Sequence, residues 1–256
     1  MAPRSIWNGT ITFGLVNVPI KLYTATESKS VGFNEVHAKD GARIQHRRIC
    51  PREDKEVPYE QIVKGYEVGP DEYVVLEKDE IKAAAGDRGK VIHLTEFVDA
   101  GEIDPVFYEK TYFIGSREDE DAYRLLREAL GRTRRAGVGR FTFHDREYLV
   151  TVRAFDDVIA LQTLRFHDEV VSAGELEIEG GQRKPSKREI EMAHRLIETL
   201  EQEFDPEQYE DSYRKAVLEL IKRKAAGKKI DLAQQEEPAH GDDLAAALQA
   251  SLGARG

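Results

Sequence analysis

The sequence predicts an α+β fold, in which a closed β-barrel or sandwich fills the first two thirds of the chain and helices follow. The first observation is a series of short segments, from about residue 10 to residue 166, in which apolar and polar residues alternate. Many short strands at such regular spacing are typical of barrels and sandwiches. The second observation is a change of pattern after Gly180-Gly181, where apolar residues recur at helical spacing instead.

The strands begin with residues 10–23, where the phase of the apolar alternation changes beside Gly14. This change predicts a bulge or bend within one long strand, and Pro19 indicates an edge or bulge position because proline lacks an amide donor. The further strand candidates are residues 42–49, 72–77, 90–98, 106–115, 138–155 as a hairpin with its turn near Asp145-Arg146, and 157–166.

One helix is expected among the strands, over residues 118–131. Its apolar stripe includes Leu126 and Leu130, and acidic residues crowd its first turn, where the helix dipole favours them. Gly131 is expected just after the helix, because glycine adopts the left-handed conformation that ends many helices.

Further helices are expected after residue 185. Ser186 and Glu189 form a capping-box pattern ahead of a helix that runs to about Leu200. Asp205-Pro206 predicts a second helix start, and Gly227 its end. Residues 242–252 form a third, short amphipathic pattern that would order only on a partner, since so short a helix is marginal in water.

Composition indicates a cytosolic protein of one or two domains. The chain has 256 residues, of which 40% are apolar, and a single cysteine, Cys50, which fits a reducing compartment. It shows neither a membrane-spanning apolar run nor a secretory leader at its first residues.

The net charge of −10 disfavours nucleic acid as a partner, but the charges are unevenly distributed. Residues 1–52 carry 8 Lys and Arg against 3 Asp and Glu, and residues 131–153 carry 6 against 2. Residues 53–130 carry 10 against 21, and residues 231–256 carry 1 against 5. The basic stretches could bind an anion while the acidic ones face water, although solvated surface charge explains the same counts.

Motifs of catalysis and of cofactor binding are absent from the sequence, so we expect neither an enzyme nor a bound cofactor. It contains no G-x-G-x-x-G, G-x-S-x-G, H-E-x-x-H or C-x-x-C motif. His37, His46 and Cys50 could suggest zinc, but an obvious fourth ligand is missing, so no metal is expected. Acidic pairs such as Asp156-Asp157 leave a metal-dependent nuclease open as an alternative.

Several stretches, in consistent order, resemble the bacterial Ku family. They extend over most of residues 4–229 and end with Phe-Asp-Pro and Tyr-x-Asp-x-Tyr landmarks. The similar stretches are IWNGTITFGLVNVPIKLY (6–23), HAKDGARIQHRRIC (37–50), VPYEQIVKGYE (57–67), EFVDAGEIDPVFYEKTYFIG (96–115), AYRLLREAL (122–130) and EIEMAHRLIETLEQEFDPEQYEDSYRKAVLELIKRKAAGK (189–228).

The resemblance implies a β-barrel core with an inserted, DNA-encircling arm over residues 1–178. It also implies a helical, ligase-recruiting segment over residues 179–229, followed by a flexible acidic tail over residues 230–256. Such a protein would be a cytoplasmic, nucleoid-associated homodimer that threads double-stranded DNA ends through a ring, without ATP, membrane, metal or cofactor. It would recruit an ATP-dependent DNA ligase for non-homologous end joining.

The resemblance also suggests which residues act. A clamp that ignores sequence should contact phosphates through lysine and arginine. The residues expected to line the DNA path are Lys21, Lys29, Lys39, Arg43, Arg47 and Arg48, with Arg132, Arg134, Arg135 and Arg140 as a second group. The residues expected to contact the ligase are Arg188, Arg195, Tyr209, Tyr213, Arg214 and Lys222. A protein-interaction scaffold without DNA binding is the remaining alternative, and each basic residue could instead be a solvated surface charge.

Overall fold

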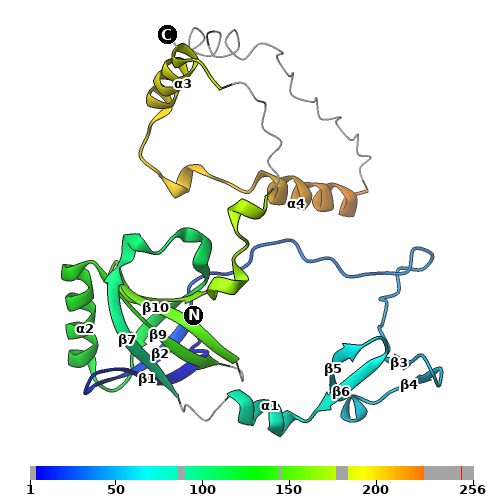
Figure 1. Ribbon diagram of the computed structural model, residues 1–256. Helices are drawn as coiled ribbons and strands as arrows, with labels where there is room; N and C mark the ends of the chain where they lie inside the picture. The colour runs from blue at the N-terminus through cyan, green and yellow to red at the C-terminus, as the bar shows by residue number, and fades with distance from the viewer. Residues whose placement is uncertain (1–3, 86–89, 144–145, 177–183, 228–248, 250–256) are drawn as a thin grey trace. The chain divides into compact units, whose positions relative to one another are not determined.

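The computed structural model describes residues 4–85, 90–143, 146–176, 184–227 and 249. The chain divides into two units, the first made of Met1–Ser28 and Glu35–Glu175, the second of Lys29–Asn34 and Leu176–Gly256. Figure 1 shows the barrel of the first unit and the helices of the second. Among the described residues, no helix is both long and apolar enough to cross a membrane.

Seven strands of the first unit close into a barrel, which confirms the α+β prediction with its barrel core. In order around the barrel they are β1 (Trp7–Phe13), β2 (Val16–Thr24), β8 (Tyr108–Ser116), β11 (Val158–Leu164), β10 (Arg146–Phe155), β9 (Arg135–Phe143) and β7 (Val91–Asp99). Neighbouring strands are antiparallel except β1 and β7, whose parallel pairing closes the barrel. A closed barrel leaves no free sheet edge, so the seven strands form a stable platform.

The prediction of one long strand over residues 10–23 is wrong, because β1 and β2 form a tight hairpin. Phe13 pairs with Val16 across a two-residue loop, and Gly14 has a φ of +57°. A glycine with positive φ at the first loop position is the signature of a type II′ hairpin turn. Since Ile11 pairs with Val18, the two apolar phases lie on the same face of the hairpin.

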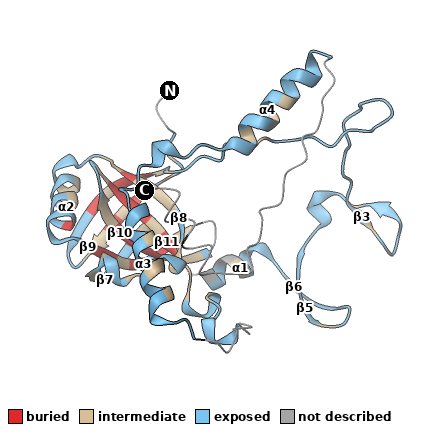
Figure 2. Ribbon diagram, turned by 90° about the horizontal axis from the view of Figure 1, so that it is seen from above, coloured by how far each residue is buried: buried red, intermediate tan, exposed pale blue. Residues whose placement is uncertain are grey.

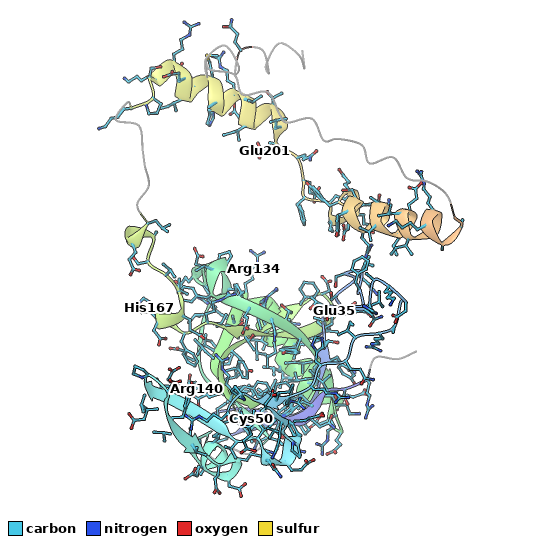
Figure 3. The ribbon with its side chains drawn as sticks, turned by 90° about the vertical axis from the view of Figure 1, so that its right-hand side faces the viewer. Glu35, Cys50, Arg134, Arg140, His167 and Glu201 are labelled. Carbon is cyan, nitrogen blue, oxygen red and sulfur yellow. The ribbon has the colours of Figure 1, made fainter. Side chains whose placement is uncertain are left out.

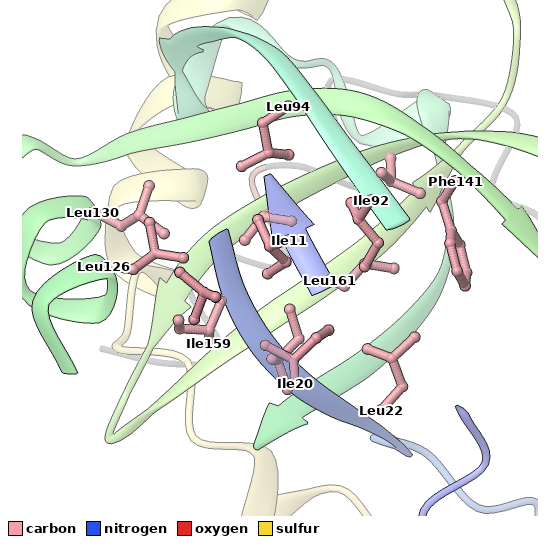
Figure 4. Close-up of a cluster of buried hydrophobic side chains, with 14 residues drawn as sticks. Ile11, Ile20, Leu22, Ile92, Leu94, Leu126, Leu130, Phe141, Ile159 and Leu161 are labelled. Carbon is pink, nitrogen blue, oxygen red and sulfur yellow. The ribbon is translucent and has the colours of Figure 1, made fainter. Parts of the chain in front are cut away.

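The barrel interior is the hydrophobic core (Figure 4). Ile11, Ile20, Ile92 and Leu161 are fully buried, and every barrel strand contributes at least one such side chain. The ring of Trp7 meets that of Phe141 edge to face, with centroids 4.9 Å apart. Burial of these apolar side chains supplies the main stabilising free energy of this unit.

Helix α2 (Glu120–Thr133) packs against the barrel through the two buried side chains Leu126 and Leu130. Asp119 caps its start, accepting a hydrogen bond from the Ala122 amide at 2.9 Å. The expected end at Gly131 is wrong: the helix continues to Thr133, and Arg134 adopts the left-handed conformation with a φ of +54°. The last turn is stabilised by the Thr133 hydroxyl, which donates to the Ala129 carbonyl at 2.8 Å.

Tyr123 joins α2 to two barrel strands. Its hydroxyl donates to the Ile114 carbonyl at 2.6 Å and accepts from the Ile159 amide at 3.1 Å. Removing that hydroxyl leaves both backbone groups without this partner, so we expect Tyr123→Phe to lower the free energy of unfolding by about 1–3 kcal/mol. Urea denaturation measures this difference, and Tyr213→Phe, at a position where the residue is 71% exposed, is the matched control.

The same contact gives a pH dependence. Burial raises the pKa of the Tyr123 phenol above its ordinary value of 10.0. A raised pKa in the folded state means that the stabilisation is complete below pH 10 and is lost as the pH rises through the raised value. The difference in stability between wild type and Tyr123→Phe should therefore shrink only above about pH 10; a constant difference across that range would contradict this assignment.

Residues 25–90, between β2 and β7, form an inserted segment. It holds the short pairs β3 (Ile49–Cys50) with β4 (Lys55–Glu56) and β5 (Lys64–Gly69) with β6 (Glu72–Leu76), the 3₁₀ turn η1 (Tyr59–Gln61), and α1 (Lys78–Ala85). The strand predicted over residues 72–77 is confirmed by β6. The one predicted over 42–49 is wrong: only an isolated bridge from Val36 to Arg43 and the start of β3 form there.

A turn at residues 37–41 explains that difference. The Asp40 carboxylate accepts from the Ala42 amide at 3.0 Å and lies 3.1 Å from Nδ1 of His37. Gly41 takes a φ of +72°, so the chain reverses where a longer strand would need extended backbone. The hydrogen bond from the Ala42 amide, followed by that from His37, lowers the pKa of the Asp40 carboxyl.

The other barrel strands agree with the predictions for residues 90–98, 106–115, 138–155 and 157–166. Phe143 pairs with Arg146, so the predicted hairpin is present, while residues 144 and 145 of its turn lie outside the described residues. Short 3₁₀ turns complete the connections: η2 (Ala100–Glu102), η3 (Pro105–Phe107), η4 (His167–Glu169) and η5 (Ala173–Glu175).

The second unit contains helices α3 (Lys187–Leu200) and α4 (Ser212–Ala225). The predicted capping box is confirmed: Ser186 accepts from the Glu189 amide, and the Glu189 carboxylate accepts from the Ser186 amide. The prediction of a helix that begins at Asp205-Pro206 is wrong, because that pair starts only the 3₁₀ turn η6 (Pro206–Gln208). Helix α4 starts later, because Asp211 caps it by accepting from the Arg214 amide at 2.8 Å.

The end of α4 agrees with the prediction, since Gly227 follows it with a φ of +69°. The helix expected over residues 242–252 lies outside the described residues except for Gln249, which is helical.

Candidate nucleic-acid interface

The inserted segment carries most of the residues expected to line a DNA path. Lys39, Arg43, Arg47 and Arg48 all lie there and are exposed to solvent. Lys29 is exposed too, but it belongs to the second unit. Over residues 29–48 the sequence has five Lys and Arg against two Asp and Glu. Exposed cations on a polar segment are the surface that phosphates require.

Arg47 and Arg48 are held by the segment that follows them. The Arg48 carbonyl accepts from the Val57 amide at 2.8 Å, and its guanidinium lies 5.2 Å from the centroid of the Tyr59 ring. The Lys78 ammonium lies 5.8 Å from the same ring. Two cations beside one aromatic ring are partly oriented by cation–π attraction while remaining accessible to an anion.

Arg47 forms an ion pair with Glu56, at 3.5 Å. Both side chains are exposed, and exposed ion pairs contribute at most about 1 kcal/mol. A phosphate could therefore replace Glu56 as the partner of Arg47. Around these residues lies a shallow pocket of about 410 Å³ lined by His46, Arg47, Arg48, Glu56, Val57, Pro58 and Tyr59.

The second group of expected residues separates into two places. Arg132, Arg134 and Arg135 cluster where α2 ends and β9 begins, and a cation such as Arg132 is favoured at a helix C-terminus. Arg132 pairs with Glu128 at 2.9 Å, and Arg135 with Asp99 at 3.6 Å.

Arg140 lies further along β9, at about 3.4 Å per residue and so roughly 17 Å from Arg135. Figure 3 labels Arg134 and Arg140, which lie well apart on the barrel. Arg140 pairs with Glu147 at 2.5 Å, whereas Lys21 lies half-exposed on β2 beside Gly115 of β8. Arg140 is therefore separate from the arginine cluster at the end of α2, and Lys21 lies on a different strand of the barrel.

Tyr59 and Lys78 are two site residues that the sequence reasoning missed. Both are brought to Arg48 by the fold of the inserted segment, and Lys78 is thirty positions away in the sequence. Counting charges along the sequence identifies the basic stretch. Such a count does not show which aromatic ring will contact its arginines in the folded chain.

The residues considered for metal chemistry have other partners. His37 contacts Asp40, and His46 pairs with Glu35 at 3.0 Å. In the pair Asp156-Asp157, the second carboxylate binds Arg127 at 3.1 Å. Within the described residues, no group of three or more His, Cys, Asp or Glu side chains is arranged to hold a metal ion.

An apolar groove lies beside α2, on the barrel. It has a volume of about 480 Å³ and is lined by Phe13, Val16, Phe97, Ala122, Leu125, Leu126, Ala129, Leu130, Thr133 and Arg135. The Leu125 side chain is 71% exposed at its rim. A groove with so few polar groups is suited to an apolar protein surface rather than to bond chemistry.

The residues expected to contact a ligase lie on both helices of the second unit and between them. Arg188 and Arg195 lie seven positions apart on α3, and therefore on one face. Tyr209 stacks on Phe204 with centroids 5.6 Å apart, and Tyr213, Arg214 and Lys222 lie on α4. Figure 2 shows that most of α3 and α4 is exposed.

Comparison with known proteins identifies the family to which these features correspond. The family model described as "Ku70/Ku80 beta-barrel domain" matches residues 12–192. The non-homologous end joining protein Ku of Anaeromyxobacter sp. (strain K) is 46% identical over 98% of this chain and 86% of its own length. The proteins of the same name from Bacillus subtilis and Archaeoglobus fulgidus are each 36% identical over 97% of this chain, and over 81% and 98% of their own lengths.

Proposed function

The chain belongs to the Ku family, and from this membership we propose that it binds the ends of double-stranded DNA in non-homologous end joining. The observation that carries the proposal is the similarity to end-joining Ku proteins over almost the whole chain, inserted segment and C-terminal helices included. We further propose that two copies form the DNA-encircling ring and that the ring recruits an ATP-dependent ligase.

The distribution of basic side chains supports binding without sequence recognition. Lys39, Arg43, Arg47 and Arg48 extend from a polar segment. Cations of this kind bind phosphates and displace counterions, so affinity should fall steeply with salt. Since none of these four residues lies on a helix that could enter a groove, contacts would be to the backbone rather than to base edges.

The hairpin of β5 and β6 supports a second copy of the chain as partner. Tyr66 pairs with Val74 and is 69% exposed, while Val74 is 49% exposed. On the opposite face of the same hairpin, Tyr73 and Val75 are exposed as well. An isolated two-stranded hairpin is marginally stable at best in water, so apolar side chains on both faces indicate that another protein surface covers them.

The two C-terminal helices support ligase recruitment. Exposed apolar side chains lie on both, such as Ile197 on α3 and Leu218 on α4, with Phe204 exposed between them. Amphipathic helices that present such side chains beside arginine and tyrosine are typical of protein-binding elements.

We expect Tyr209→Ala with Tyr213→Ala to weaken ligase binding at least about tenfold, because aromatic anchors dominate protein interfaces. Surface plasmon resonance with the immobilised protein and the end-joining ligase measures the affinity. DNA binding should not change, and Glu207→Ala with Glu210→Ala is a control with the same truncation beside the tyrosines. Equal ligase affinity for all three proteins would remove the tyrosines from this role.

One experiment separates the proposed function from the two alternatives. The purified chain is mixed with a short, end-labelled linear duplex, with and without Mg²⁺ or Mn²⁺, and examined for retarded and for shortened DNA. A DNA-end clamp retards the duplex and leaves it intact. Shortened, labelled products would identify a metal-dependent nuclease, and the absence of retardation at low salt would favour a scaffold without DNA binding.

A further inference from the structure

The face of α3 that carries Arg188 and Arg195 is partly covered. Met192 and Leu196, on or beside this face, are only half-exposed, whereas Ile190 and Ile197, on the opposite side of the helix, are 55% and 68% exposed. A pocket of about 320 Å³ on this face is lined by Arg188, Glu191, Met192 and Arg195, and by Gln249 from near the end of the chain. Gln249 therefore supplies part of the wall of this site.

The sequence around Gln249 matches such a face. Leu244, Leu248 and Leu252 recur at intervals of four, so in a helix they form one apolar stripe beside Gln249. Ala245, Ala246 and Ala247 favour a helix, and Gly253 follows at the position of a helix end. Neither this segment nor the 14-residue α3 is long enough to be a stable helix on its own in water.

The charges are complementary. Residues 236–243 contain four acidic residues and no Lys or Arg. Residues 183–200, which include α3, contain five Lys and Arg against three Glu. The fourteen residues 228–241 can span up to about 50 Å, which is long enough for the segment to reach α3 of its own chain.

We propose that residues 242–252 dock on α3 of the same chain as an amphipathic helix, over Met192 and Leu196, and so mask the face that carries Arg188 and Arg195. Leu248 enters the α3 face, and the acidic residues ahead of it interact with the basic ones. The contact stabilises α3. The docking itself does not depend on the proposed function. Its effect on ligase recruitment does, because the docked segment would compete with the ligase for this face of α3.

The test uses the full chain and hydrogen–deuterium exchange of the α3 amides. Leu248→Asp places a charge in the apolar stripe, whereas Ala246→Asp places the same charge about 160° away on the opposite side of the helix. We expect protection of α3 amides to fall several-fold in Leu248→Asp and to match wild type in Ala246→Asp. Unchanged protection in Leu248→Asp, or an equal loss in both variants, overturns the proposal.

A cross-link identifies the occupant independently of stability. In a Cys50→Ser background, Gln249→Cys is combined with Met192→Cys on α3 or, as control, with Glu219→Cys on α4. Under mild oxidation we expect an intramolecular disulfide in the α3 pair and not in the α4 pair, since a disulfide needs Cα atoms within about 7 Å. A disulfide-linked dimer would assign the docking to a second copy and contradict the proposal.

Binding to linear DNA should be unaffected in Leu248→Asp, so failure of the docking is distinguishable from failure of the DNA-end function. If the docking holds, Leu248→Asp should bind the ligase more tightly than Ala246→Asp does. Equal ligase affinity of the two variants would reject the competition, while the exchange and cross-linking results would still decide the docking.

Discussion

Reversing the charges of Arg47 and Arg48 together is expected to weaken binding to a short linear duplex by roughly a hundred- to a thousand-fold at about 0.1 M salt. Both side chains are exposed on the inserted segment, and Arg48 is oriented by Tyr59. In a dimer, Arg47→Glu with Arg48→Glu removes four cations, each of which contributes about 0.9 to the slope of log affinity against log salt. The slope should therefore decrease by about 3.6.

The matched control is Arg117→Glu with Arg124→Glu, which changes the charge equally outside both basic stretches. Fluorescence anisotropy over a series of salt concentrations gives both affinity and slope, and circular dichroism checks that each variant is folded. If both double variants lose the same affinity, the effect is one of net charge, and Arg47 and Arg48 do not line the DNA path.

Placing charges on the β5–β6 hairpin is expected to abolish dimerisation. Tyr66 and Val74 are paired neighbours on one exposed face, so Tyr66→Asp with Val74→Asp puts two like charges side by side where the second copy would pack. Desolvating an unpaired carboxylate is strongly unfavourable, and like charges directly opposite in a sheet destabilise it further. Multi-angle light scattering should then give a mass near 29.0 kDa, that of one chain.

Loss of the dimer should also remove most DNA affinity, because a single chain cannot close a ring. Tyr66→Phe with Val74→Ile keeps the apolar surface and should leave both the mass and the affinity unchanged. A dimer that persists with charges at both positions would show that this hairpin is not the interface, and a monomer that still binds ends tightly would contradict the ring.

The barrel was predictable from the sequence because its strands bury one face, and that burial imposes an alternation that can be read along the chain. Ile11 and Ile20 show it most clearly. The two-residue turn at Gly14 was not predictable, because a phase change beside a glycine fits either a bulge or a hairpin. Only the antiparallel pairing of β1 with β2 decides between them. The predicted start of α4 was wrong for a similar reason. Both Asp205 and Asp211 can cap a helix, and in the structure Asp211 caps α4 whereas Asp205 caps only the 3₁₀ turn η6.

The candidate site was predictable in part. Uneven charge identifies the basic first part of the inserted segment, residues 29–48, since phosphate binding needs only exposed cations. It did not separate Arg140 from the arginine cluster at the end of α2, because both belong to one basic stretch of sequence. Nor could it find the contact of Arg48 and Lys78 with Tyr59, which depends on how the inserted segment folds.

The central claim is that duplex DNA enters a closed ring from a free end. The most direct measurement compares binding of the wild-type chain to the same plasmid in linear and in covalently closed form, at equal mass and salt. Threading predicts retention on the linear form and almost none on the circle, with retention of a circle restored once a nuclease opens it. Equal binding to both forms would contradict the ring.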